Sequence, residues 1–172
     1  MIFRSPKLHK KFLAVLLLAG PATVVAPILS TPARAATPIA SAPAEGVIRQ
    51  QSTYGFDETV DRLKADIAGK GIRFFNEIDQ SELGAAANLP INRSKLLLFG
   101  NPPLGVQFLQ SNPLAGLDWP VRMLVTQDDS GQVWVSWTDF RFVASRYQLT
   151  GRDAQIAMAS EVAASIASST RK

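Results

Sequence analysis

Apolar residues recur along this chain with two different periods, and each period predicts one type of element. Phe56, Val60, Leu63 and Ile67 are spaced four, three and four residues apart, which places all four on one face of a helix. Gly69 follows them and is a residue well suited to the end of a helix. The pattern therefore predicts an amphipathic helix that begins at Phe56 and turns its apolar face toward a core.

The segments on either side of this helix have the character of strands. Val47 to Tyr54 has no helical stripe and predicts an edge strand, and Ile72 to Ile78 predicts a second strand. Ser81 to Asn88 is rich in small residues and predicts a short helix. Lys95 to Phe99 is the most apolar short run beyond the amino-terminal segment, so we expect it to be the buried middle strand. It ends at Gly100-Asn101-Pro102-Pro103, which favours a rigid turn.

A hairpin is predicted where two runs of β-branched and aromatic residues flank a polar turn. Val121 to Thr126 and Gln132 to Thr138 are separated by Gln127-Asp128-Asp129-Ser130-Gly131. Apolar and polar positions alternate in the second run, so its tryptophans, Trp134 and Trp137, fall on opposite faces. We therefore expect neither face of the sheet to be fully exposed to water.

The last predicted helix runs from Arg152 to Ser168, with Thr150 as its expected cap. Four of its residues share one face; they are Ile156, Ala159, Ala163 and Ile166. The order strand, helix, several strands, helix predicts the α+β class, with two helices on one face of a mostly antiparallel sheet.

The first 35 residues have the three-part pattern of a secretory signal peptide. A basic start precedes the apolar run from Phe12 to Ala19, and Ala33-Arg34-Ala35 forms a small-x-small cleavage site. No arginine pair precedes the run and no cysteine follows it, so general secretion without a lipid anchor is the simplest interpretation. The alternative is an uncleaved membrane anchor, because Phe12 to Leu29 approaches the ~20 apolar residues of a spanning helix. Pro21 and Pro27 weaken that alternative, and we expect a periplasmic or secreted protein.

Removal of the signal peptide changes the charge of the protein. Residues 1–35 hold five of the 18 Lys and Arg and none of the 14 Asp and Glu, so 13 basic and 14 acidic side chains remain. A net charge of −1 gives no support for nucleic-acid binding. Residues 36–46 are rich in Ala and Pro and predict a disordered linker, and residues 47–172 have the size of a single domain.

The mature chain has neither an imidazole nor a thiol, because the sequence contains no cysteine and its one histidine is His9. Ser-His-Asp and Cys-His catalysis, thiol redox chemistry, ordinary zinc sites and haem ligation by His or Cys are therefore excluded. The only pair of adjacent aspartates, Asp128-Asp129, lies in the predicted hairpin turn, which favours turn formation over catalysis or calcium binding. We expect no metal site and no cofactor.

Five short motifs occur in a fixed order along the chain. They are Phe56-Asp57-Glu58-Thr59-Val60, Ile78-Asp79, Leu98-Phe99-Gly100-Asn101-Pro102, Asp118-Trp119-Pro120 and Val133-Trp134-Val135-Ser136. Together they resemble the domain-of-unknown-function 302 family over roughly Val47 to Ile166. The resemblance implies the order strand, helix, four strands, helix, similar to the TATA-binding-protein-like arrangement, and implies no nucleic-acid role. It implies no activity, and Gln80 stands where the family usually has histidine after Ile-Asp.

Five residues are candidates for ligand binding. Asp79 and Asn101 each follow a predicted strand end, where loops present polar groups. Trp119 could form an apolar wall of a binding site, and Arg146 and Tyr147 lie between the last predicted strand and the last predicted helix. Each also has a structural interpretation. In that interpretation, Asp79 caps the following helix, Asn101 closes a turn and the tryptophan belongs to the core. Arg146 and Tyr147 hold Asp79 or Asp139 in place.

Two functions from different classes fit this sequence. The first is an exported, non-catalytic module that binds a small or hydrophobic ligand between helices and sheet, or a protein partner on the exposed side of the sheet. The second is a carboxylate-dependent enzyme without metal or thiol, with Asp79 as general base and with Asn101 and Tyr147 orienting the substrate.

We predict that the mature protein begins at Ala36. Ala33 and Ala35 suit the shallow pockets of signal peptidase, and Arg34 occupies the permissive position between them. Amino-terminal sequencing of the exported protein checks this expectation. A mature protein that retained the run from Phe12 to Ala19 would establish the membrane-anchor alternative instead.

Overall fold

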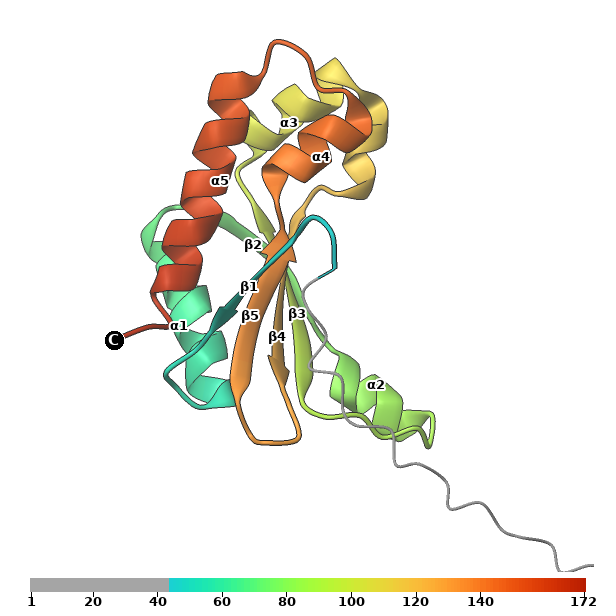
Figure 1. The fold of residues 1–172 in the computed structure, drawn as a ribbon, viewed down its shortest axis with the longest axis vertical. Helices are drawn as coiled ribbons and strands as arrows, with labels where there is room; N and C mark the ends of the chain where they lie inside the picture. The colour runs from blue at the N-terminus through green and yellow to red at the C-terminus, as the bar shows by residue number, and fades with distance from the viewer. Residues whose placement is uncertain (1–43) are drawn as a thin grey trace, which may run out of the picture. The chain divides into compact units, whose positions relative to one another are not determined.

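The computed structural model describes residues 44–172, which form a five-stranded sheet with helices around it (Figure 1). The signal peptide, the cleavage site between Ala35 and Ala36 and most of the linker lie outside the described residues. All strand pairs are antiparallel, in the order β1-β5-β4-β3-β2. The strands are β1 (Val47–Gln51), β2 (Arg73–Asp79), β3 (Ser94–Gly100), β4 (Val121–Gln127) and β5 (Val133–Thr138).

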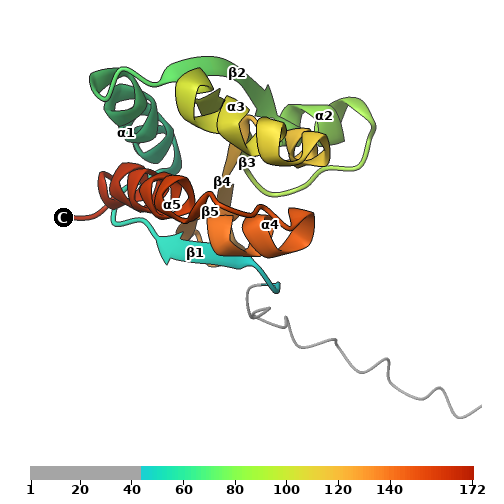
Figure 2. The same cartoon turned by 90° about the horizontal axis from the view of Figure 1, so that it is seen from above.

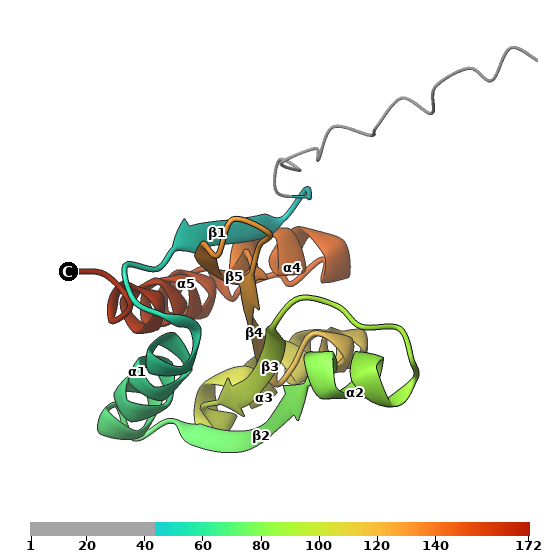
Figure 3. The same cartoon turned by 90° about the horizontal axis from the view of Figure 1, so that it is seen from below.

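Two long helices, α1 and α5, cover one face of this sheet, as Figures 2 and 3 show from opposite ends. Three shorter helices and one 3-10 turn are inserted between the strands or after them. The helices are α1 (Phe56–Gly69), α2 (Gln80–Ala86), α3 (Pro102–Ser111), α4 (Phe140–Tyr147) and α5 (Asp153–Ser168), and the 3-10 turn η1 is Pro113–Leu117. The predicted α+β class and antiparallel sheet are confirmed. None of the helices in residues 44–172 has the length and apolarity to cross a membrane.

The core lies between the sheet and the two long helices. Side chains alternate along β5, so Val133, Val135 and Trp137 are buried while the residues between them are half-buried. Val135 pairs with Val125 of β4, and both are fully buried. Leu63 of α1 is also fully buried, so the core face follows from the apolar spacing in the sequence.

Three local expectations are wrong. The centre of the sheet is β4 rather than the segment Lys95 to Phe99, because β3 lies one position nearer the β2 edge. Thr150 does not cap α5, whose N-cap residue is Arg152 and has no side-chain cap hydrogen bond. The turn expected after β3 is the start of α3. Proline fits the first positions of a helix, where no backbone donor is required.

We predict that Leu97→Ala lowers the free energy of unfolding by about 2–5 kcal/mol, because Leu97 is fully buried and a cavity would remain. Urea denaturation of the wild type and the variant measures the change. Leu83→Ala is a matched control, since the Leu83 side chain is 61% exposed. A loss below about 0.5 kcal/mol for Leu97→Ala, as expected of a surface change, would contradict the burial of β3.

Candidate functional site

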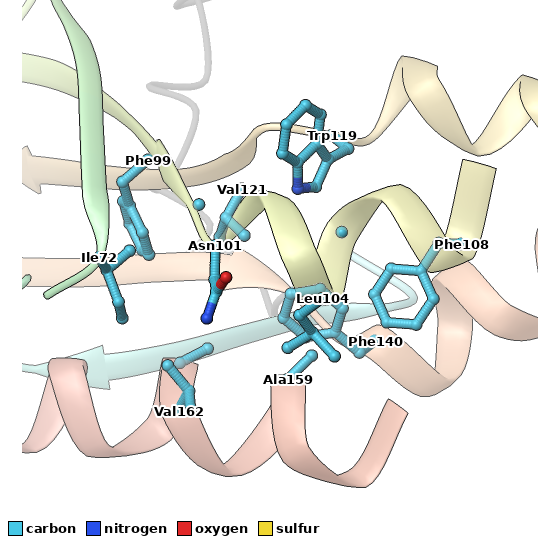
Figure 4. A pocket seen from close by; sticks show the side chains of 13 residues that line it. Ile72, Phe99, Asn101, Leu104, Phe108, Trp119, Val121, Phe140, Ala159 and Val162 are labelled. Atoms are coloured by element: carbon cyan, nitrogen blue, oxygen red, sulfur yellow. The ribbon is translucent and has the colours of Figure 1, made fainter. Parts of the chain in front are cut away.

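A groove between α3 and α5 is the best-formed candidate site in the described residues. It consists of an inner cavity of about 40 Å³ and an adjoining outer hollow of about 250 Å³. The two share Asn101 and Leu104, which therefore stand at the boundary between them. Phe99, Phe108 and Val162 are among the apolar side chains around the inner cavity (Figure 4).

The wall of the inner cavity depends on two glycines that make room for Trp119. A Cβ atom at Gly105 would lie 1.8 Å from the indole nitrogen of Trp119, and one at Gly100 would lie 3.2 Å from it. Phe75 of β2 packs edge-on against the same indole, with 5.8 Å between the ring centroids. Two segments that are separate in the sequence therefore pack against each other, namely Gly100 to Gly105 and Asp118 to Pro120.

Asn101 precedes α3 as its N-cap residue, yet its side chain makes no cap hydrogen bond and is exposed. The first two helical residues, Pro102 and Pro103, have no backbone N–H to donate. The next two backbone donors, of Leu104 and Gly105, bond to the Asn101 carbonyl oxygen at 3.1 and 2.8 Å. The helix end therefore needs nothing from the Asn101 amide, which is available at the mouth of the inner cavity (Figure 4).

The groove carries polar groups but no ionisable ones. Of the described residues that line the inner cavity or the outer hollow, none is Asp, Glu, Lys, Arg, His or Tyr. In the outer hollow, the Gln155 amide donates to Gln107 at 3.0 Å, and the Gln107 amide donates to the Pro103 carbonyl at 2.9 Å. The groove is thus apolar inside, with neutral amides at its rim.

Asp79 lies at the other end of the sheet. In the β2–β3 pair, Asp79 is opposite Lys95, whereas Gly100, the residue before Asn101, is opposite Arg73. Six positions along β2 and five along β3 separate these two pairs, which corresponds to about 16–20 Å. Figure 1 shows the same separation, with α2 and α3 at opposite ends of the strands.

The contacts of Asp79 are those of a helix cap. Its carboxylate accepts hydrogen bonds from the Ser81 hydroxyl at 2.5 Å and the Glu82 backbone N–H at 3.0 Å. Together with nearby Lys95, these bonds lower the pKa of the Asp79 carboxyl. The structure therefore does not bring Asp79 and Asn101 together, and it places Asp79 where the capping interpretation expects it.

Tyr147 and Arg146 act on Asp118 rather than on Asp79 or Asp139. The Tyr147 hydroxyl donates to Asp118 at 2.6 Å, and this bond raises the pKa of the phenol. Arg146 is 3.5 Å from the same carboxylate, and Arg122 also binds it. Since Asp118 directly precedes Trp119, this cluster ties the tryptophan loop to α4. Neither Arg146 nor Tyr147 lines the groove.

Hydrogen bonds also lower the pKa values of two carboxyls elsewhere in the domain, those of Asp128 and Glu77. The Ser130 hydroxyl and the Trp134 indole hydrogen-bond to Asp128 and lower its pKa to about 2, so the hairpin aspartate is a turn former. Hydrogen bonds from Lys95 and Lys64, each at 2.9 Å, lower the pKa of Glu77. Within residues 44–172, no three His, Cys, Asp or Glu side chains gather where a metal could bind.

The sequence matches the family described as "Domain of unknown function DUF302" over residues 48–170. The chain belongs to the DUF302 family. The crystal structure of an uncharacterised DUF302 protein from Bacillus stearothermophilus superposes with a TM-score of 0.68 and 18% identity. The superposition covers 74% of this chain and all of that one. At this identity the likeness shows a shared fold alone, and it confirms the expected DUF302 architecture.

Curated relatives of this DUF302 chain include two proteins named as fluoride-specific ion channels. The fluoride-specific ion channels FluC 1 of Brucella suis and FluC 1 of Brucella abortus are each 32% identical to it over 104 residues, or 60% of this chain. The matched part is 41% of the first channel and 38% of the second. The chain thus spans about two fifths of the length of these relatives.

Sequence reasoning identified Asn101 and Trp119 but missed the helical side of the groove. Leu104 and Phe108 line the inner cavity from α3, and Ala159 and Val162 line it from α5. The four-residue spacing of Leu104 and Phe108 is a helical signal. The two prolines that precede Leu104 favoured a turn, so the sequence did not predict this helix.

We predict that Gly105→Ala destabilises this DUF302 domain by about 1–3 kcal/mol, because the new methyl group would overlap the Trp119 indole. Gly69→Ala is the matched control, since Gly69 is also a helical glycine, the last residue of α1, but has no atom within 4 Å of its Cβ position. Urea denaturation with tryptophan fluorescence measures both variants.

A double variant separates this clash from a simple helix effect. In a Trp119→Leu background the overlap with the indole is gone, so Gly105→Ala should cost little or nothing. An equal loss in both backgrounds would show that the glycine serves some purpose other than admitting Trp119.

Proposed function

We propose that this protein is an exported, non-catalytic module that binds a small, neutral and partly apolar ligand in the groove between α3 and α5. The observation that carries the proposal is made within residues 44–172: the Asn101 amide has no hydrogen-bond partner there and stands at the mouth of a cavity with no ionisable lining side chain. Apolar pockets with a few placed polar groups are the usual form of small-molecule sites. The signal-peptide pattern of residues 1–35 supports export.

The size of the groove limits the ligand. An inner cavity of about 40 Å³ admits two or three water molecules, or one small apolar group, since a water needs about 10–15 Å³ on this measure. The outer hollow of about 250 Å³ takes the remainder of the molecule. Both together fall at or below the ~300–1,000 Å³ of drug-sized pockets, so the ligand has few heavy atoms.

The lining also favours a neutral ligand over an ion. An anion in the inner cavity would lose its water without meeting a positive side chain, and such burial is costly. Of the described part of the chain, only the Asn101 amide and the Trp119 indole line the cavity with side-chain donors. The fluoride-specific channels among the relatives make fluoride a necessary probe, and we expect it to bind more weakly than a neutral molecule.

The alternative, a carboxylate-dependent enzyme, has less support. A general base works best with a pKa near the working pH, and the carboxyls of Asp79, Glu77 and Asp128 all have lowered pKa values. Asp79 is also separated from Asn101 by the length of the sheet. Tyr147 is engaged with Asp118 instead of facing the groove.

We predict that Asn101→Ala weakens ligand binding by about threefold to tenfold, which corresponds to one lost hydrogen bond of ~0.5–1.5 kcal/mol. Stability should change by less than about 0.5 kcal/mol, because the side chain caps nothing. Native mass spectrometry of protein purified from the cells that express it identifies the retained ligand. Nuclear magnetic resonance titration with N-methylacetamide, 1-butanol and sodium fluoride measures binding at the Trp119 indole.

Asp79→Ala is the matched control. It removes the cap of α2 and should cost about 0.5–2 kcal/mol of stability, with ligand and probe binding unchanged. If Asn101→Ala melts early like Asp79→Ala and binds the ligand and the neutral probes normally, the groove is not the binding site. Tighter binding of fluoride than of the neutral probes would contradict the proposed ligand class.

A further inference from the structure

The two edges of the sheet differ in whether another strand can be added to them. At the β2 edge, the pairing with β3 shifts register between Phe74 and Asn76, and such a bulge twists and interrupts an edge. At the β1 edge, Val47 to Gln51 pair with β5 in one unbroken register. Figures 2 and 3 show β1 and β2 at opposite margins of the sheet.

The hydrogen bonds at the two ends of β1 show which backbone groups face outward. Asp139 donates to the Gly46 carbonyl, and Ser52 donates to the Val133 carbonyl. In an antiparallel pair, hydrogen-bonded positions alternate, so the even-numbered residues of β1 bond to β5. The backbone N–H and C=O groups of Arg49 and Gln51 therefore point away from the sheet.

A hollow of about 480 Å³ runs beside these outward-facing groups. Ile48, which is 38% exposed, contributes to its lining together with the buried Trp137. Among the described residues, the indole N–H of Trp137 has no hydrogen-bond partner. Side chains of an added strand would enter this hollow at alternate positions, on the face of the sheet that carries the core.

Among the described residues, the ionisable side chains that line this hollow are all basic. Arg49 and Arg171 line the hollow, which no acidic residue lines, and Lys172 follows Arg171. The Arg49 guanidinium lies 3.9 Å from the centroid of the Trp134 ring, which holds it beside the edge. A second copy of the chain paired through β1 would bring arginines of like charge together, and such pairs are unfavourable.

We propose that β1 is a docking edge for an extended acidic segment of a partner protein, which adds to the sheet as a sixth strand. Its backbone would bond to Arg49 and Gln51, and its apolar side chains would pack on Ile48. Acidic side chains on the opposite face would lie near Arg49. Strand addition of this kind gains affinity from the main chain and specificity from alternate side chains. The site is separate from the α3–α5 groove.

Amide hydrogen exchange and fluorescence anisotropy test this proposal on the purified chain. The probe is a short labelled peptide in which glutamate alternates with valine, and the charge control is the same peptide with lysine in place of glutamate. We expect the acidic peptide to bind at least tenfold more tightly than the lysine peptide. We also expect it to slow exchange at the backbone amides of Arg49 and Gln51, which exchange rapidly in the free chain.

Two variants of Arg49 test the edge, one that removes the outward-facing N–H together with the charge and one that reverses the charge alone. Arg49→Pro removes an outward-facing N–H and leaves the β5 hydrogen bonds in place, so it should abolish binding without unfolding the domain. Arg49→Glu should reduce the preference for the acidic peptide at least tenfold. Arg73→Glu, on the opposite edge strand, is the matched control and should change neither. Circular dichroism confirms that each variant is folded.

Three results would overturn the proposal. The first is equal affinity for both peptides, and the second is protection of the Arg49 and Gln51 amides before any peptide is added. The third is a concentration-dependent dimer in sedimentation that Arg49→Pro converts to monomer, since the occupant of the edge would then be a second copy of the chain.

Discussion

The indole of Trp119 occupies a notch that exists only because positions 100 and 105 have no side chain, and the candidate groove depends on this contact. Gly105 lets α3 approach the indole, and that approach closes the inner cavity against α5. On the other side, Asp118 is held by the Tyr147 hydroxyl, so the loop that carries the tryptophan is fixed to α4. The cavity is thus shaped by positions on β2, β3 and α3 that are separated in the sequence but meet at one ring.

The parts of the fold that could be predicted are those in which one local period decides the outcome. The four apolar residues of α1 and the alternation in β5 each lead to the observed burial, because the core needs one apolar face per element. The position of a strand in the sheet is a different matter. Lys95 to Phe99 in β3 is the most apolar run, yet the central strand of the sheet is β4. Apolarity does not distinguish the two, because β3 also has a strand on each side and helices over it and is buried like a central strand.

The candidate site was predicted in part for a similar reason. Asn101 and Asp79 both follow strands, and from the sequence they are equivalent. In an antiparallel pair, however, the last residues of successive strands lie at opposite ends of the sheet along the strand direction, so one residue faces the groove and the other caps α2. The Asn101 amide is free only because Pro102 and Pro103 remove the donors it would otherwise cap. The free amide could not be predicted from the sequence, because the two prolines indicated a turn at the position where α3 begins.

The register shift in β2 also bears on how this domain behaves in a crowded compartment. Growth of a sheet from molecule to molecule requires two pairing edges on each molecule, one to accept a strand and one to offer the next. Here one margin is regular and the other is interrupted between Phe74 and Asn76. A series of edge-to-edge contacts is therefore disfavoured beyond a single step, because the interrupted margin offers no regular strand for the next molecule.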